Sequence, residues 1–286
     1  MSVARYVAPD TLEEVLDEMS VQDGSYGFMA GGTIVQPLLS AGSWLPSTVI
    51  GLWRAPLDAT IQNDETLIIG AGTRLRDLAN RDVPSGLRDA ARQVGGPAVR
   101  NRATLGGNVA SSHGDLIVPL LALGALVTLA SPAGTRDVSI DELFAPAPEG
   151  ANGDIPGVKG DELLTSVVIP HSTGRGAYAY LGRKAYNTPL VVAAAVEAVV
   201  DPTSNTVSEV RVAVQGPSQW PVRAYAVERA IIGRTLENET LNDAEAALAA
   251  LGSGYSDAVA SAWYRASMSK VVLRRALIQI AEGGQS

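Results

Sequence analysis

The chain has 286 residues, of which 46% are hydrophobic and 18% charged, a composition typical of a globular protein with a sizeable core. Its formal net charge of −8 provides no overall basic field for nucleic acid or anionic lipid. With no cysteine and two histidines, the sequence excludes disulfides, thiolate nucleophiles and cysteine-ligated zinc or iron–sulfur clusters within this chain, and it disfavours a multi-histidine metal site.

No targeting or membrane segment is recognisable in the sequence. The N-terminus lacks the apolar core of a signal peptide. The longest apolar run, 189–200, is too short to span a bilayer and contains Glu197. We therefore expect a cytoplasmic protein without a membrane span.

The first half of the chain alternates short strands and helices. Thr11 and Glu14 form a capping box that predicts a helix to about Met19. Apolar runs predict strands at 26–29, 48–53, 66–71 and 162–169, helices at 87–94 and 116–123, and a hairpin of 125–130 with 136–140. The stretch 146–160 is rich in Pro, Gly, Asn and Asp, which is typical of a loop.

The second half has a different order of elements. Strands are predicted at 177–184, 191–200 and 207–214, and helices follow at 221–232, 241–251 and 261–281. A sheet followed by helices indicates a separate α+β unit.

The first candidate site is the Gly-Gly turn made by Ala30, Gly31, Gly32, Thr33 and Ile34. Glycines let the backbone approach a phosphate, and successive N–H groups in such a turn form an anion-binding nest. The alternative is a structural turn between a strand and a helix, and the motif alone favours that alternative.

A second Gly-Gly segment, Thr104–Asn108, follows the basic stretch Arg100–Arg102 and precedes Ser111, His113 and Asp115. Glycines and small polar residues at this density suit a buried polar ligand, but they are also typical of a long polar loop. Two such segments together favour a shared phosphate-bearing ligand. Neither matches a Walker A loop or a dinucleotide-binding glycine fingerprint.

Seven segments occur in an order and spacing that cover nearly the whole chain. They read MAGGT, LIIGAGTRLRDL, VRNRATLGGNVA, DLIVPLLALGALVTLAS, GDELLTSVVIP, GRKAY and SAWYRASMSKVVLRRAL. In this series the chain resembles the medium, FAD-binding subunit of the molybdenum hydroxylases, the xanthine dehydrogenase and carbon monoxide dehydrogenase family.

The resemblance implies an α+β fold with an FAD-binding domain of the PCMH type at 1–173, divided into α/β subdomains at about 1–55 and 56–173, and a smaller C-terminal α+β domain at 174–286. It also implies which residues contact FAD. The two glycine segments would hold the pyrophosphate, Ser111 and Asp115 would face the ribityl and adenosine portions, Leu164 would touch adenine, and Tyr186 would shield the isoalloxazine. The full set is Ala30, Gly31, Gly32, Thr33, Ile34, Thr104, Gly106, Gly107, Asn108, Ser111, Asp115, Leu164 and Tyr186.

Three positions depart from the family pattern. Ile34 stands where the family loop has an aspartate. The stretch SSHGD has His113 and no proline where relatives have Ser-Pro-x-x-Asp. Asn187 follows GRKAY in the region where the family has the pattern R-K-x-x-D.

The function implied by the resemblance is electron transfer within a molybdenum-containing hydroxylase. Substrate would be oxidised at a molybdopterin cofactor in a large partner subunit, and 2Fe-2S clusters in a small partner subunit would pass electrons to FAD and on to an external acceptor. We expect a dimer of heterotrimers and no catalytic acid or base in this chain. A stand-alone FAD oxidoreductase and a flavin-free assembly subunit are the alternatives.

Overall fold

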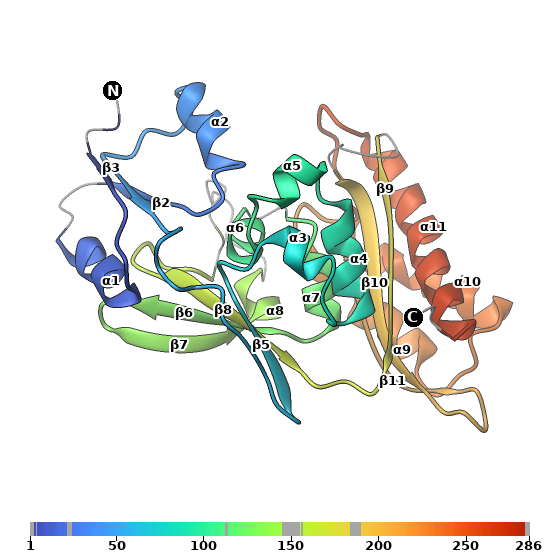
Figure 1. Ribbon diagram of the computed structural model, residues 1–286. Helices are drawn as coiled ribbons and strands as arrows, with labels where there is room; N and C mark the ends of the chain where they lie inside the picture. Colours follow the sequence, from blue (N-terminus) through green and yellow to red (C-terminus); the bar gives the residue numbers. More distant parts are fainter. Residues whose placement is uncertain are drawn as a thin grey trace.

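The structure is a computed structural model that describes residues 3, 5–21, 25–111, 114–144, 155, 157–183 and 190–283. Its described part contains three sheets. Figure 1 shows the first and the last sheet on opposite sides of the molecule, with a group of short helices between them. The predicted α+β fold is confirmed.

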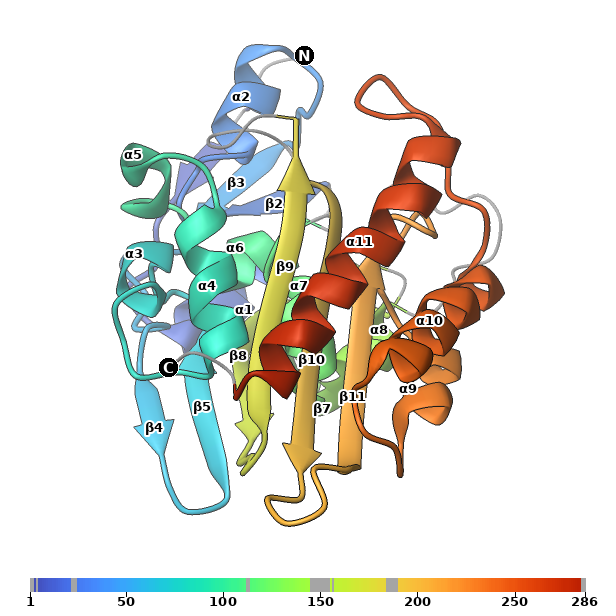
Figure 2. The same ribbon diagram turned by 90° about the vertical axis from the view of Figure 1, so that its right-hand side faces the viewer.

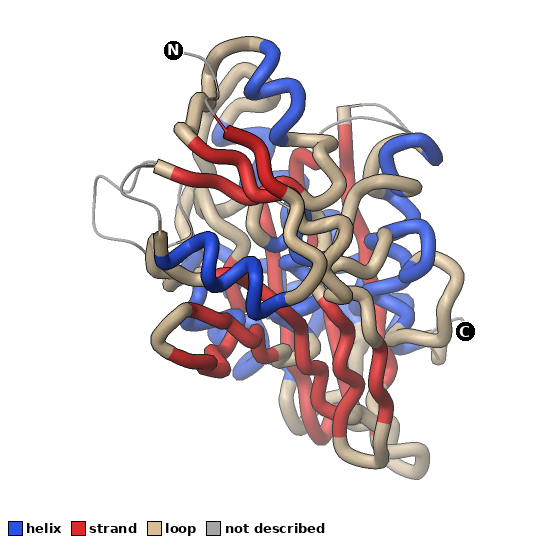
Figure 3. Tube along the Cα trace, turned by 60° about the vertical axis from the view of Figure 1, so that its left-hand side comes forward, coloured by secondary structure: helices blue, strands red, loops and turns tan. Residues whose placement is uncertain are grey.

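The first sheet is small and parallel. Its strand order is β1-β3-β2, with β1 at Arg5–Val7, β2 at Tyr26–Met29 and β3 at Thr48–Gly51, and its helices are α1 (Leu12–Ser20) and α2 (Val35–Ser40). The hydroxyl of Thr11 accepts a hydrogen bond from the N–H of Glu14 at 3.1 Å, which confirms the predicted cap of α1. Figure 3 shows α1 between this sheet and the longer strands of the second sheet.

The second sheet is antiparallel and has the strand order β4-β5-β8-β6-β7. Its strands are β4 (Thr60–Gln62), β5 (Thr66–Gly70), β6 (Leu126–Ser131), β7 (Gly134–Ser139) and β8 (Leu163–Pro170). The associated helices are α3 (Leu75–Leu78), α4 (Ser85–Gln93), α5 (Pro97–Arg100), α6 (Leu105–Val109), α7 (Ile117–Ala122) and α8 (Ile140–Leu143).

The third sheet, with strand order β12-β11-β10-β9, is also antiparallel. It consists of β9 (Arg175–Gly182), β10 (Leu190–Val200), β11 (Val207–Gln215) and β12 (Val222–Arg223), followed by α9 (Tyr225–Ile231), α10 (Asn238–Ala247), a 3-10 turn (Leu248–Leu251) and α11 (Ala262–Ala281). The helix predicted from residue 221 begins only at Tyr225, because Val222 and Arg223 pair with β11 as a strand.

The two faces of this third sheet have different partners. Figure 2 shows α11 crossing one face, while α4 and α7 lie on the other. On the face toward α4 and α7, Ala193, Ala195 and Ala213 are buried in the same core cluster as Leu87 and Leu120. Small side chains at these positions let helices pack closely on the strands. The predicted domain boundary at residue 173 lies between Pro170 of β8 and Arg175 of β9, and it stays a prediction.

In the described part of the chain, no helix is long and apolar enough to cross a membrane. Within the same residues, no group of three or more His, Cys, Asp or Glu side chains is arranged to hold a metal ion.

Candidate functional site

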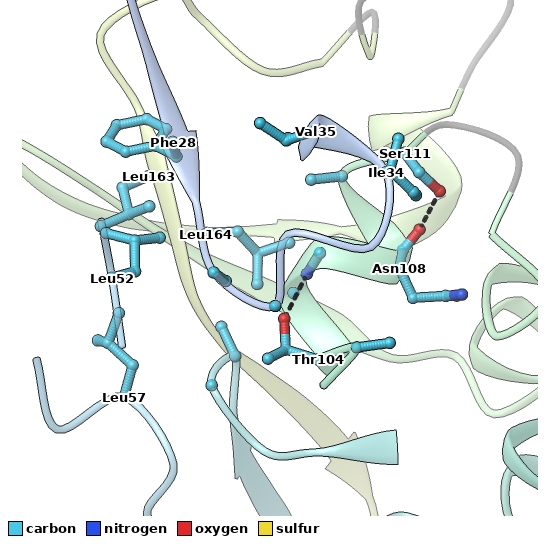
Figure 4. A pocket seen from close by; sticks show the side chains of 18 of the residues that line it. Phe28, Ile34, Val35, Leu52, Leu57, Thr104, Asn108, Ser111, Leu163 and Leu164 are labelled. Carbon is cyan, nitrogen blue, oxygen red and sulfur yellow. Dashed lines mark hydrogen bonds between the residues drawn. The ribbon is translucent and has the colours of Figure 1, made fainter. Parts of the chain in front are cut away.

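A cavity of about 910 Å³ lies between the first and second sheets and is lined by both glycine segments. Figure 4 shows Phe28, Leu52, Leu57 and Leu163 gathered on one side of it and Asn108 and Ser111 on the other. One part of the cavity is therefore apolar, whereas the other presents backbone and small polar groups.

The first glycine segment follows β2 and leads into α2. Gly31 is buried, and a Cβ there would lie 2.1 Å from the carbonyl oxygen of Arg102. Gly32 has φ +74°, a conformation that favours glycine, and its carbonyl accepts the N–H of Gln36 at 3.0 Å in the first turn of α2. Both glycines are thus required by geometry, one for a close approach and one for a positive φ.

The second segment was expected to be a loop, but its residues form the short helix α6. Thr104 is the N-cap, and its hydroxyl accepts the N–H of Gly107 at 3.1 Å. The N–H of Gly106 donates to the carbonyl of Ala71 at 2.8 Å, and a Cβ at Gly106 would lie 2.7 Å from the Cβ of Ala71. The cap and this close contact outweigh the low helix propensity of two adjacent glycines.

The polar residues after α6 differ in their positions. The side-chain oxygen of Asn108 accepts the N–H of Leu116 at 3.1 Å, and the hydroxyl of Ser111 donates to the carbonyl of Asn108 at 2.6 Å. Asp115 is not among the residues that line the cavity, and burial raises its pKa from 3.8 to about 6. The hydroxyl of Tyr178 is buried and lacks a hydrogen-bond partner among the described residues, and its pKa is raised mainly by burial and further by the charge of the Asp115 carboxylate.

The structure brings eleven of the thirteen expected residues together around one cavity. They are Ala30, Gly31, Gly32, Thr33, Ile34, Thr104, Gly106, Gly107, Asn108, Ser111 and Leu164. Figure 4 shows Leu164 between the apolar group of Leu52, Leu57 and Leu163 and the polar Asn108. Tyr186, like His113 and Asn187, lies outside the described residues. The role of each residue in binding FAD stays a prediction.

The lining also includes residues that the sequence reasoning missed. Phe28 lies within β2, Leu52 directly follows β3, Leu57 precedes β4, and Leu163 begins β8. Leu57 and Leu163 also belong to the core cluster around α1, so their sequence pattern is that of ordinary core residues. The segment Ala71–Arg74 lines the cavity as well, and the glycines on either side of Ala71 in GAGT were the available signal.

Glu162 lies at the edge of the cavity with its charge already paired. It accepts hydrogen bonds from Arg136 at 2.6 and 2.8 Å and from the N–H of Lys159 at 2.8 Å. These donors lower the pKa of Glu162 to about 2, with the Arg136 hydrogen bonds as the main cause. This carboxylate therefore stabilises the cavity wall and is unsuited to act as a general base near neutral pH.

These features fit an elongated ligand that carries phosphate and a planar apolar group. The first glycine segment leaves room for phosphate oxygens beside its backbone, whereas in the second segment the N–H groups of Gly106 and Gly107 already donate to Ala71 and Thr104. The cavity lies within the usual size range of ligand sites, about 300–1,000 Å³. The apolar side can cover an aromatic ring. FAD has both parts.

Residues 2–172 match the sequence family described as the FAD binding domain in molybdopterin dehydrogenase. The chain belongs to this family. Residues 176–280 match a second family, the CO dehydrogenase flavoprotein C-terminal domain. The chain is thus a medium, FAD-binding subunit of the carbon monoxide dehydrogenase and xanthine dehydrogenase family, and its assignments as an oxidoreductase subunit with FAD as cofactor are confirmed.

Relatives of known name align with the chain from end to end. The glyceraldehyde dehydrogenase medium chain of Sulfolobus acidocaldarius is 28% identical over 285 residues, covering 96% of this chain and 98% of the relative. The 6-hydroxypseudooxynicotine dehydrogenase complex subunit alpha of Paenarthrobacter nicotinovorans is 30% identical over 286 residues, covering 95% and 92%. Both are named as chains of larger enzymes.

The fold is that of a solved relative. The chain in the structure of reconstituted CO dehydrogenase from Oligotropha carboxidovorans superimposes with a TM-score of 0.90 at 23% identity, over 99% of this chain and 98% of that one.

Proposed function

We propose that this medium subunit transfers electrons from 2Fe-2S clusters of a small partner subunit, through FAD, to an external acceptor. A large partner subunit with a molybdopterin cofactor oxidises the substrate. The assembly in this proposal is a dimer of heterotrimers located in the cytoplasm. Both alternatives remain open to test, a stand-alone FAD oxidoreductase and a flavin-free assembly subunit.

The single observation that carries the proposal is the cavity where the two glycine segments meet. Segments that are far apart in the sequence converge there around one space, and all four glycines of the two segments line it. The lack of cysteine in the sequence means that iron–sulfur clusters would have to be held by another chain. The relatives named as medium chains agree with a role in a larger complex.

Within this site the residues have separate tasks. The segments Ala30–Ile34 and Thr104–Asn108 hold the diphosphate, Leu164 and its apolar neighbours cover the adenine, and Ser111 faces the ribityl and adenosine portions. The expected contact of Asp115 is left out of the proposal, because Asp115 does not line the cavity. Tyr186 is proposed to shield the isoalloxazine. The bound FAD supplies reversible uptake and release of electrons, and the chain positions it and limits the access of water.

The substitution at Ile34 is compatible with this proposal. Its side chain is 46% exposed at the rim, and the loop there is fixed by the positive φ of Gly32 and by the contacts of Gly31. A carboxylate at position 34 is therefore not needed to shape the loop.

The test is the absorption spectrum of the purified chain, with the cofactor released by heat and identified by chromatography. Visible flavin bands and released FAD are the expected result. A colourless chain that takes up no added FAD would contradict the proposal and favour the assembly subunit. Purification of the tagged chain from its native host should recover a larger and a smaller chain, and their absence would favour the stand-alone enzyme.

A further inference from the structure

Two arginine side chains join the two glycine segments. The Nε of Arg102 donates a hydrogen bond to the carbonyl oxygen of Gly31 at 3.1 Å, across 71 positions of sequence. The guanidinium of Arg74 in turn donates to the carbonyl oxygen of Arg102. Arg74 lines the cavity, whereas Arg102 is not among the lining residues and lies behind the Gly31 loop. The contacts therefore run from the first loop, through Arg102, to the cavity wall.

The same carbonyl of Arg102 is the group against which Gly31 packs, 2.1 Å from where a Cβ would be. A terminal nitrogen of Arg102 lies 3.8 Å from the corresponding Cβ position of Gly32. The guanidinium is therefore beside the glycine whose positive φ shapes the loop. Movement of Arg102 would change the spacing of the two segments.

The charges of these two arginines are not neutralised locally. Among the residues that the structure describes, neither Arg74 nor Arg102 forms an ion pair, whereas the neighbouring Arg76 pairs with Asp77 at 3.2 Å. Both guanidinium groups therefore keep a full positive charge beside the glycine segments. Guanidinium groups match phosphate in both charge and geometry.

We infer that Arg74 and Arg102 are positioning residues of a diphosphate subsite, where they hold the two glycine segments at a fixed spacing and add positive charge beside the phosphates. This inference rests on the proposed binding of FAD. Neither residue was among the expected FAD contacts.

The test compares ligands with and without phosphate. The full-length apo chain and its variants Arg102→Gln, Arg102→Lys and Arg74→Gln are titrated with FAD, ADP and riboflavin at low and high salt. Arg76→Gln is the matched control, because it removes an exposed arginine two positions from Arg74. Thermal melting of each apo variant checks the fold.

We expect Arg102→Gln and Arg74→Gln to weaken FAD and ADP binding about tenfold, which corresponds to about 1.4 kcal/mol. Riboflavin, which has no phosphate, should bind as to the unsubstituted chain. The difference should shrink near 1 M salt, where the screening length falls to about 3 Å. Arg102→Lys should recover part of the affinity, and Arg76→Gln should change nothing.

Unchanged FAD and ADP affinities in both glutamine variants would overturn the inference, and so would an equal loss for riboflavin, since that would indicate a general structural defect. If the unsubstituted chain binds ADP but not FAD, the proposed flavin function fails, while the ADP comparison still decides the role of the arginines. Binding of neither ligand would refute both.

Discussion

Substitution of Gly31 by alanine tests the geometry of the site most directly. The added Cβ would lie 2.1 Å from the carbonyl oxygen of Arg102, 2.7 Å from its carbonyl carbon and 2.9 Å from the Cα of Ala103. All three are backbone atoms, so no side chain can rotate away. The contact with the oxygen can be relieved only if the two glycine segments separate by about 1 Å, since carbon and oxygen in contact need about 3 Å or more.

The magnitude follows from the cost of such overpacking, about 1–3 kcal/mol. If the whole cost falls on the site, FAD affinity decreases about 5- to 150-fold, because each 1.4 kcal/mol is about a factor of ten. Separation of the segments would also weaken the hydrogen bond from Arg102 to the Gly31 carbonyl. Part of the cost will then appear as a lower melting temperature of the apo chain.

Two measurements on the same protein separate these contributions: the dissociation constant of FAD by titration, and the melting temperature with and without excess FAD. Gly96→Ala is the control, since nothing lies within 4 Å of a Cβ at Gly96 and its φ of −87° suits alanine. The control should bind FAD and melt like the unsubstituted chain. A Gly31→Ala variant with unchanged affinity and melting temperature would refute the close approach of the two segments and the reasoning built on it.

Three further outcomes can be checked by unfolding the apo chain. Asn108→Ala removes the side-chain acceptor of the buried Leu116 N–H and should lower the free energy of unfolding by about 1–3 kcal/mol, measured by denaturant titration. Asn108→Asp keeps an acceptor and should lose less stability. The folded chain holds the proton of Asp115 more tightly than the unfolded chain, so the free energy of unfolding should fall by about 1–3 kcal/mol as the pH rises from 3.8 to about 6. Asp115→Asn should flatten this dependence of the unfolding free energy on pH. A variant with the same pH dependence as the unsubstituted chain would contradict the burial of this carboxylate. For Glu162 the sign is opposite: its stabilisation is present above pH 4.5 and lost as the pH falls toward about 2. Arg136→Gln should weaken that acid dependence, leaving the part due to the N–H of Lys159, and should cost about 1.5–3 kcal/mol at neutral pH.

Local patterns in the sequence were sufficient for most of the elements. The cap at Thr11, the apolar runs of β8 and β10, and the turn between β6 and β7 act within a few residues, so the sequence predicts them without knowledge of the neighbours. The short strands β1, β4 and β12 were not predicted. Each has two or three residues, and its conformation depends on pairing with a partner strand.

The sequence by itself also identified the two glycine segments, because two such segments in one chain, in the order and spacing of the family, favour a shared phosphate-bearing ligand over two unrelated turns. Only the tertiary structure decided that Gly31 meets the backbone of Arg102, that Thr104 caps a helix where a loop was expected, and that Asp115 lies outside the cavity lining. It also assigned Leu57 and Leu163 to both the core and the cavity. A leucine that packs against a neighbour and a leucine that faces a ligand have the same local pattern, and the difference between them arises only from which distant segments fold against them.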